Sequence, residues 1–249
     1  MKLLAIETAT EACSVALWID GDVRERFEIA PRRHAELALP WADIVLADAG
    51  LSKSQLDAIA VGRGPGAFTG VRLAIALAQG IALALDIPVV PVSTLAALAM
   101  QEKGSGPLRA STGPGPSSTR GRDRVCILAA IDARMGEIYL GAFDRDADGL
   151  VVPTGAEQLV RPDAAVLSGD SCWLGVGTGF AADEGALART LGGRLLQCDA
   201  VALPHAADVA RLGARAFANG EAIAPERIEP AYLRDKVALT LVEQRNARG

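Results

Sequence analysis

The opening pattern of this chain occurs twice, and this duplication limits the fold more than any other feature. Each copy has two apolar runs, an Asp-Gly turn and a third extended stretch, with an acid at the first bend (Glu7 and Asp132). Alternating apolar residues of this kind are typical of strands. The pattern predicts a duplicated α/β fold with two lobes across a cleft, a place where nucleotides commonly bind. The runs are 3–8, 14–19 and 23–29 in the first copy and 125–131, 138–143 and 150–152 in the second.

The composition fits a soluble cytoplasmic protein. The 249 residues are 50% hydrophobic, enough for a large core. The formal net charge of −5 argues against a protein that binds nucleic acid unaided. Four cysteines lie far apart, which favours reduced thiols over disulfides or a zinc site. The most apolar stretch, 71–85, is shorter than the roughly 20 residues that cross a bilayer.

The first lobe is expected to span 1–100. Apolar residues at helical spacing predict a helix over 34–49, with Gly50 as its C-terminal cap and Pro40 marking a kink or a later start. A strand–helix–strand unit follows and predicts a mixed sheet covered by helices. Its parts are the strand 57–61, the helix 71–85 and the strand 87–92.

The second lobe is expected to span 125–249, after a linker at 101–124. The linker is rich in Gly, Pro, Ser and Arg and has no apolar period. Beyond the second copy of the strands, the pattern predicts a glycine-rich strand and turn, two helices and a less regular tail. A terminal helix can pack back on the first lobe. These segments are 173–179, 181–191, 204–219 and 229–249.

Two segments have residue types that suit phosphate binding. The glycine-rich stretch 62–70 precedes a helix, but Val71 and Arg72 stand where a Walker loop has Lys and Ser or Thr, which favours a tight strand-to-helix turn. The acid and hydroxyls at the first bend are weak candidates for a vestigial phosphate loop, with local backbone hydrogen bonds as the favoured alternative. These candidates are Glu7, Thr8 and Thr10.

Few other residues suggest a catalytic or metal-binding site. Asp132-Ala133-Arg134 favours an ion pair or a turn cap, and the two histidines, His34 and His205, have no ligand spacing. We therefore expect no catalytic residues, no metal and no cofactor. The helix 71–85 is apolar on nearly every side, so it needs cover from its own core or from another chain. The pattern alone leaves both possibilities open.

Several blocks together resemble the TsaB (YeaZ) family, whose members are bacterial accessory subunits for threonylcarbamoyladenosine formation in tRNA. The resemblance covers most of the chain and implies a duplicated actin/Hsp70-like (ribonuclease H-like) fold of two lobes, with mixed sheets flanked by helices. The blocks are Leu4–Thr10, Arg33–Leu37, Val61–Arg72, Pro91–Leu95, Ile131–Tyr139 and Pro230–Arg234.

The resemblance implies a non-catalytic partner of TsaD, the paralogue that transfers the threonylcarbamoyl group to adenosine next to the anticodon. TsaD holds a metal through a His-x-x-x-His motif, and the matching stretch here, 93–97, contains no histidine. TsaE is expected to join the assembly. The chain is expected to contact tRNA only within the complex and to form a homodimer when alone. The stretch 104–124 is longer than the family leads us to expect, and we assign it no role.

The resemblance also implies a contact with TsaD through the two helices of the first lobe, roughly His34–Ala49 and Phe68–Leu85, packed against the matching pair in TsaD. The alternative from another class is an autonomous ATP-binding phosphotransferase or hydrolase of the actin-like superfamily, suggested by the duplicated cleft and Glu7. The residues expected at the partner interface are His34, Glu36, Leu37, Trp41, Ile44, Val45, Val71, Arg72, Ile75 and Gln79.

Overall fold

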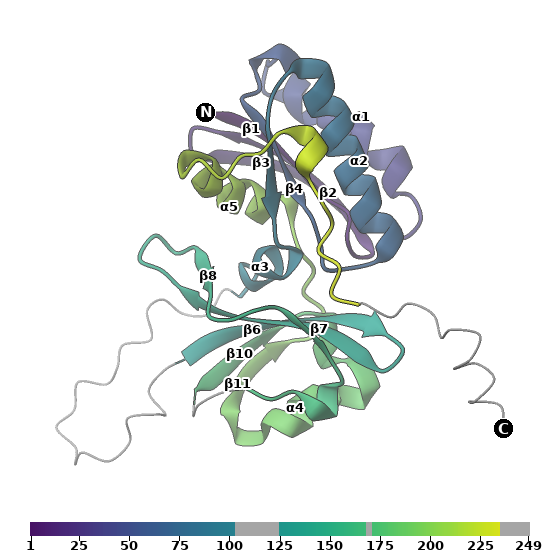
Figure 1. Ribbon diagram of the computed structural model, residues 1–249, viewed down its shortest axis with the longest axis vertical. Helices are drawn as coiled ribbons and strands as arrows, with labels where there is room; N and C mark the ends of the chain where they lie inside the picture. Colours follow the sequence, from purple (N-terminus) through teal and green to yellow (C-terminus); the bar gives the residue numbers. More distant parts are fainter. Residues whose placement is uncertain (103–124, 168–170, 235–249) are drawn as a thin grey trace.

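The computed structural model describes residues 1–102, 125–167 and 171–234. Two mixed sheets lie one above the other, the first with helices on both faces and the second with a helix on its outer face (Figure 1). The predicted linker 101–124 lies, apart from its first two residues, outside the described part of the chain.

The first sheet has the strand order β3-β2-β1-β4-β5. β1 pairs antiparallel with β2 and parallel with β4. β1, β2 and β4 are almost wholly buried because layers cover both faces, whereas β3 alternates between exposed and half-buried residues along its length, as an edge strand does. The strands are β1 (Lys2–Glu7), β2 (Ala12–Ile19), β3 (Asp22–Ile29), β4 (Ala58–Gly62) and β5 (Val89–Val92).

The second sheet repeats the first. Its order, β11-β10-β6-β7-β8, read in reverse, matches the first sheet strand for strand, with an antiparallel meander followed by two parallel strands. The duplication predicted from the sequence is therefore confirmed, and β9, an additional strand, pairs with β7. The strands are β6 (Val125–Arg134), β7 (Glu137–Arg145), β8 (Val151–Pro153), β9 (Gln158–Val160), β10 (Cys172–Val176) and β11 (Leu195–Asp199).

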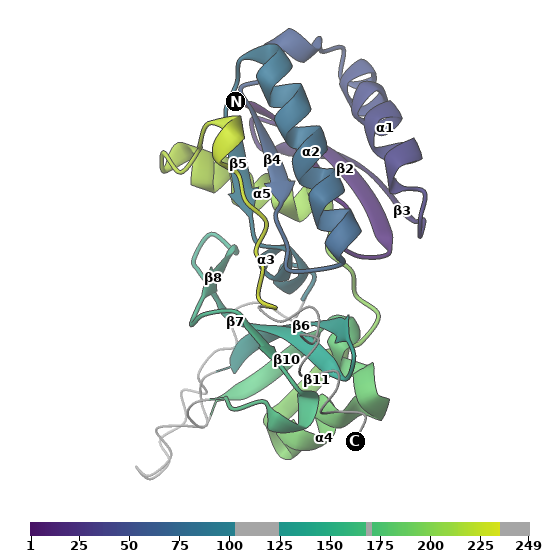
Figure 2. The same cartoon turned by 45° about the vertical axis from the view of Figure 1, so that its right-hand side comes forward.

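The helices form layers around the sheets. α1 (His34–Asp48) and α2 (Phe68–Leu85) lie side by side on one face of the first sheet, and α5 (Ala206–Ala218) covers the other face (Figures 1 and 2). α3 (Thr94–Ala99) packs between the sheets against β6 and α5, and α4 (Ala186–Leu191) packs beside the second sheet. The short 3-10 helices are Lys53–Gln55, Pro162–Ala164, Thr178–Phe180, Ala182–Gly185, Gly192–Arg194 and Pro225–Arg227.

Three apolar clusters follow from this layering. One lies under α1 and α2 and includes Ile6, Val15 and Val61. A second joins the two sheets through α3 and α5, and a third lies under α4. Because α5 packs on β1, β2 and β4, the C-terminal part of the chain returns to the first sheet and holds the two sheets together.

Several predicted boundaries need correction. α1 runs from His34 through Pro40, so the alternative of a later start is wrong, although the proline nitrogen donates no helix hydrogen bond. α2 begins at Phe68, as the family resemblance implies, rather than at Val71, where the apolar pattern placed the start. Of the predicted helix 181–191, the last six residues form α4, because residues 183 and 184 have left-handed φ angles of 48° and 54°. α3, β9 and β11 were not predicted.

Candidate functional site

The bend between β1 and β2, which holds Glu7, Thr8 and Thr10, is closed by the chain's own atoms. Thr8 Oγ1 donates to the carbonyl oxygen of Gly70 at 2.8 Å, and the Thr10 hydroxyl accepts from the amide of Ala12 at 3.4 Å. All three side chains at the bend are buried. The hydroxyls therefore satisfy nearby backbone groups, which favours a structural role for this bend over phosphate binding.

The glycine-rich turn between β4 and α2 packs directly on that bend. A Cβ atom added to Gly66 would lie 2.4 Å from the carbonyl oxygen of Ala9, and one added to Gly70 would lie 2.0 Å from that of Thr8. The Ala67 amide donates to the same Ala9 oxygen at 2.7 Å. These glycines permit backbone-to-backbone contact, so the geometry supports the tight strand-to-helix turn rather than a phosphate loop.

Glu7 is a buried carboxyl group, with 1% of its surface exposed. Burial raises the pKa of Glu7 to about 7, against the opposing effect of two hydrogen bonds that its carboxylate accepts, from the Ala9 amide at 2.7 Å and the Thr94 hydroxyl at 3.0 Å. A Cβ on Gly62 would lie 1.9 Å from Glu7 Oε2. Glu7 thus joins β1, β4 and α3, and these contacts account for its position without a ligand.

The corresponding acid of the second copy forms the predicted ion pair. Asp132 Oδ2 accepts from Arg134 Nη1 at 3.0 Å, and its other oxygen accepts from the Arg134 amide at 2.8 Å. Within the described ranges, no three His, Cys, Asp or Glu side chains gather in a way that could hold a metal ion.

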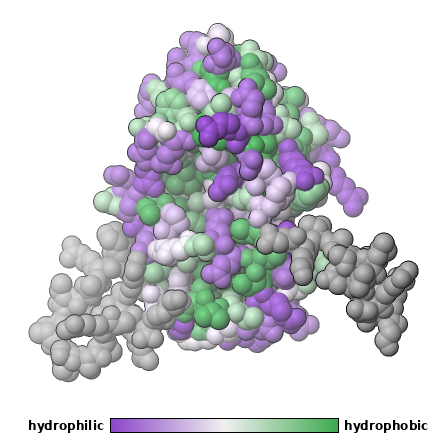
Figure 3. All heavy atoms as spheres, viewed as in Figure 1, coloured by the Kyte–Doolittle hydropathy of each residue, from purple (hydrophilic) through white to green (hydrophobic). Residues whose placement is uncertain are grey.

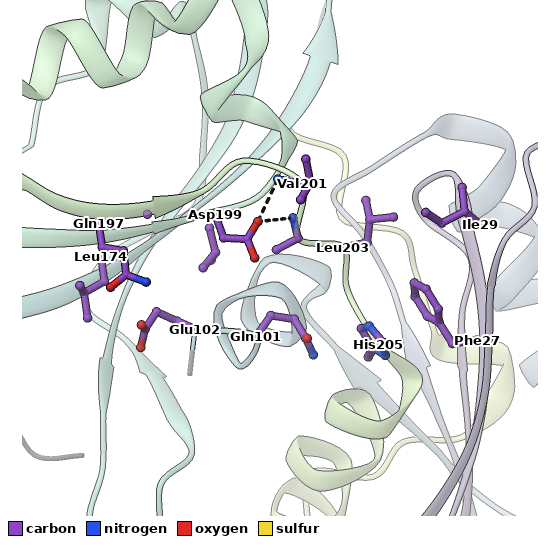
Figure 4. A pocket seen from close by; sticks show the side chains of 13 residues that line it. Phe27, Ile29, Gln101, Glu102, Leu174, Gln197, Asp199, Val201, Leu203 and His205 are labelled. Atoms are coloured by element: carbon purple, nitrogen blue, oxygen red, sulfur yellow. Dashed lines mark hydrogen bonds between the residues drawn. The ribbon is translucent and has the colours of Figure 1, made fainter. Parts of the chain in front are cut away.

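A groove of about 500 Å³ lies between the two sheets, beside their edge strands (Figure 4). Several of its polar and aromatic side chains contact the chain itself. Asp199 Oδ1 accepts from the amides of Val201 and Ala202, both at 3.1 Å. His205 stacks on Phe27 with ring centroids 4.0 Å apart. The duplicated pattern predicted a cleft between the lobes but not its lining residues, because these come from β3, the segment after α3, β10, β11 and the segment before α5.

The outer surface of α1 and α2, which we call the α1–α2 face, has several exposed or half-exposed apolar side chains. Leu39 is 45% exposed on α1, and Phe68 and Leu83 are 55% and 53% exposed on α2. Between the last two, Ala76 and Gly80 are also exposed. Figure 3 shows apolar patches among polar residues on the upper part of the molecule, where these helices lie.

α2 is more apolar than its own fold requires. By length and composition it could cross a membrane, but it packs on the first sheet, as the core helix of a soluble protein also does. One third of its residues, 33%, are buried. Leu77, Ile81 and Leu85 are partly buried against the apolar cluster under the helix, whereas Phe68 and Leu83 remain exposed.

The structure divides the ten residues that were predicted at the partner interface. Val45, Val71 and Ile75 must be removed from the prediction, because they are 2%, 4% and 7% exposed and face the sheet. An apolar helix gives no sequence signal for which side faces its own core. Those that remain at least partly accessible on α1 and α2 are His34, Glu36, Leu37, Trp41, Ile44, Arg72 and Gln79.

Two of the accessible residues contact the C-terminal segment. The Gln79 side-chain amide donates to the Pro225 carbonyl oxygen at 3.0 Å, and Arg72 Nε donates to the Tyr232 hydroxyl at 2.7 Å. Tyr232 was not predicted as a site residue. The only sequence signal for Tyr232 was its place in the block Pro230–Arg234 that resembles the family. Its contact with Arg72 could not be predicted, because the two residues are 160 positions apart in the sequence.

Known proteins similar to this chain were found by sequence and by structure. The family model TsaD, described as tRNA N6-adenosine threonylcarbamoyltransferase, matches residues 28–240. A protein of Escherichia coli K12, named tRNA threonylcarbamoyladenosine biosynthesis protein TsaB, is 42% identical over 96% of both chains. This chain belongs to the TsaB family. A TsaB protein of Haemophilus influenzae is 36% identical over 95% of both chains.

The structural comparison agrees with TsaB family membership. The structure of YeaZ from Pseudomonas aeruginosa is 39% identical and superposes with a TM-score of 0.79, covering 93% of this chain and 99% of that one. The family and the fold class predicted from the sequence are both confirmed.

Proposed function

We propose that this chain is a non-catalytic, cytoplasmic subunit that binds a TsaD-type transferase and supports threonylcarbamoyladenosine formation in tRNA. The relatives' names support the pathway, since several are called tRNA threonylcarbamoyladenosine biosynthesis proteins. The observation that carries the docking role is α2, an apolar helix on which Phe68 and Leu83 are more than half exposed and of whose residues 33% are buried. Surface of this kind marks an interaction site.

The α1–α2 face is the proposed contact surface. Leu39, Phe68 and Leu83 supply exposed apolar area, and Ala76 and Gly80 permit close approach of a partner helix. The same face would pair two copies of the chain in the absence of the transferase. TsaE would join the assembly formed on this subunit, and tRNA would be bound through the complex, because the net charge of −5 does not suit direct binding.

Leu83→Asp is expected to weaken binding of the TsaD-type subunit by at least about 30-fold, the equivalent of a 2 kcal/mol hot spot. The cause is a carboxylate placed within an apolar contact. Calorimetric titration of the purified partners measures the affinity, and modified adenosine in tRNA measures the output of the reconstituted complex. Both are expected to fall.

The matched control is Leu196→Asp. Leu196 lies on β11 of the second sheet and is 54% exposed, against 53% for Leu83. It is expected to leave the affinity and the modification yield unchanged. If Leu83→Asp and Leu39→Asp both bind the transferase as tightly as the unaltered chain, the α1–α2 face is not the contact surface. If the complex modifies tRNA equally well without this chain, the accessory role is wrong.

The alternative, an autonomous ATP-dependent phosphotransferase or hydrolase, has less support. The turn 62–70 that would cradle phosphate lies against the Glu7–Thr10 bend, and an added Cβ at Gly70 already meets the backbone at 2.0 Å. We expect calorimetric titration of the isolated chain with Mg-ATP to show no micromolar binding. Micromolar binding that Glu7→Ala abolishes would favour the enzyme instead.

A further inference from the structure

An exposed cluster of Phe68, Arg72 and Tyr232 stands at the N-terminal end of α2. The Arg72 guanidinium lies 3.5 Å above the Phe68 ring and 5.5 Å from the centroid of the Tyr232 ring. The two rings are 6.4 Å apart, and the side chains of Phe68 and Tyr232 are 55% and 53% exposed. Arginine and aromatic residues grouped in this way are enriched at the centres of protein interfaces.

Arg72 makes no ion pair with any residue that the structure describes. Many other arginines do, among them Arg33 with Glu28 and Arg215 with Asp146. Arg72 donates through Nε to Tyr232, and its two terminal nitrogens have no hydrogen-bond partner in the described part of the chain. The Tyr232 hydroxyl accepts this bond, so its own hydrogen is available to a further acceptor. The cluster therefore presents a cation and a hydroxyl donor on one surface.

The segment that carries Tyr232 is fixed on both sides. Ile228, before it, is 5% exposed and packs in the cluster under α1 and α2. The Ala231 amide donates to the Arg63 carbonyl oxygen at 2.8 Å. After Tyr232, Arg234 pairs with Glu137 of the second sheet at 2.7 Å. Tyr232 is thus held in place, and it orients Arg72 before any partner arrives.

We propose that Tyr232 and Arg72 together bind a carboxylate of the TsaD-type partner, so that the C-terminal segment completes the α1–α2 face. This inference rests on the proposed function. A planar guanidinium held in place is suited to a carboxylate, and the interaction gains strength when the contact excludes water. The cluster is continuous with the apolar surface of α2, which favours a protein carboxylate over an RNA phosphate as its occupant.

Arg72→Gln is expected to weaken binding of the TsaD-type subunit by about 10- to 100-fold, because one charged partner of a desolvated pair is lost. Arg72→Lys is expected to lose nearly as much, since a lysine cannot donate through a planar fork. Raising the salt concentration is expected to weaken the unaltered complex more than the Arg72→Gln complex. Calorimetry at low and high salt measures all three.

Tyr232→Phe tests the positioning role of the hydroxyl while it retains the ring. It is expected to weaken binding by about 3- to 10-fold alone and to add little to Arg72→Gln, because the two act as one unit. Additive losses in this double-mutant cycle would overturn the positioning role. Arg72 and Tyr232 are both exposed, so the variants are expected to melt at the temperature of the unaltered chain.

The outcomes separate this inference from the proposed function. If Leu83→Asp abolishes binding while Arg72→Gln and Tyr232→Phe bind normally, the carboxylate contact is wrong and the docking face stands. If Arg72→Gln binds the transferase normally but the complex loses affinity for tRNA, Arg72 contacts a tRNA phosphate rather than a carboxylate of the partner. The inference is then overturned. If neither Leu83→Asp nor Arg72→Gln changes the affinity, the docking face itself is wrong.

Discussion

Gly70→Ala is expected to destabilise the fold by about 3 kcal/mol or more, the range of severe overpacking in a rigid core. The added Cβ would lie 2.0 Å from the carbonyl oxygen of Thr8 and 3.4 Å from the Cα of Ala9. Both contacts are with backbone atoms, which cannot relieve a clash by changing rotamer as a side chain can. Denaturant unfolding followed by far-ultraviolet circular dichroism measures the loss.

Gly80→Ala is the matched control in the same helix. An added Cβ there meets nothing within 4 Å. Because glycine within a helix costs roughly 0.5–1 kcal/mol relative to alanine, this variant is expected to be as stable as the unaltered chain or slightly more so. Equal stability of the two variants would contradict the close packing of α2 on the first bend.

The strands of both copies could be predicted because their residues alternate and because the pattern occurs twice. The end of α1 was also visible, since Gly50 has the left-handed φ of 66° that a helix end favours. The rest depended on contacts that local patterns do not encode. α3 has six residues, too few for a helical period, and the break before α4 comes from left-handed Asp183 and Glu184.

From the sequence, the proposed contact surface could be assigned to two helices, but the buried and the accessible side chains among the ten predicted residues could not be separated. α2 is apolar around most of its circumference, so its pattern could not separate Ile75, which faces the sheet, from Leu83, which faces outward. The Arg72–Tyr232 contact was also out of reach, because the chain passes through the second sheet and α5 between them. Such positions depend on which side of a helix is buried and on contacts between residues that lie far apart in the sequence.

Glu7→Gln is expected to reduce the pH dependence of folding stability. Burial raises the pKa of Glu7 from 4.5 to about 7, so the folded chain holds a proton that the unfolded chain releases. Stability is therefore expected to fall by about 1.4 kcal/mol per pH unit as the pH rises between these two pKa values, and to level off above the higher one. Glutamine is similar in shape and does not ionise.

The difference in unfolding free energy between Glu7→Gln and the unaltered chain is expected to move in favour of the variant by roughly 2 to 3 kcal/mol between about pH 5 and about pH 8. Denaturant titrations across this range measure it, and taking the difference cancels the titration of other groups. Glu36→Gln, a change on the exposed side of α1, serves as the control and is expected to give a flat difference. If the difference for Glu7→Gln is also independent of pH, Glu7 is ionised in the folded chain. The surroundings of Glu7 would then be more polar than its contacts with Thr94 and Gly62 indicate.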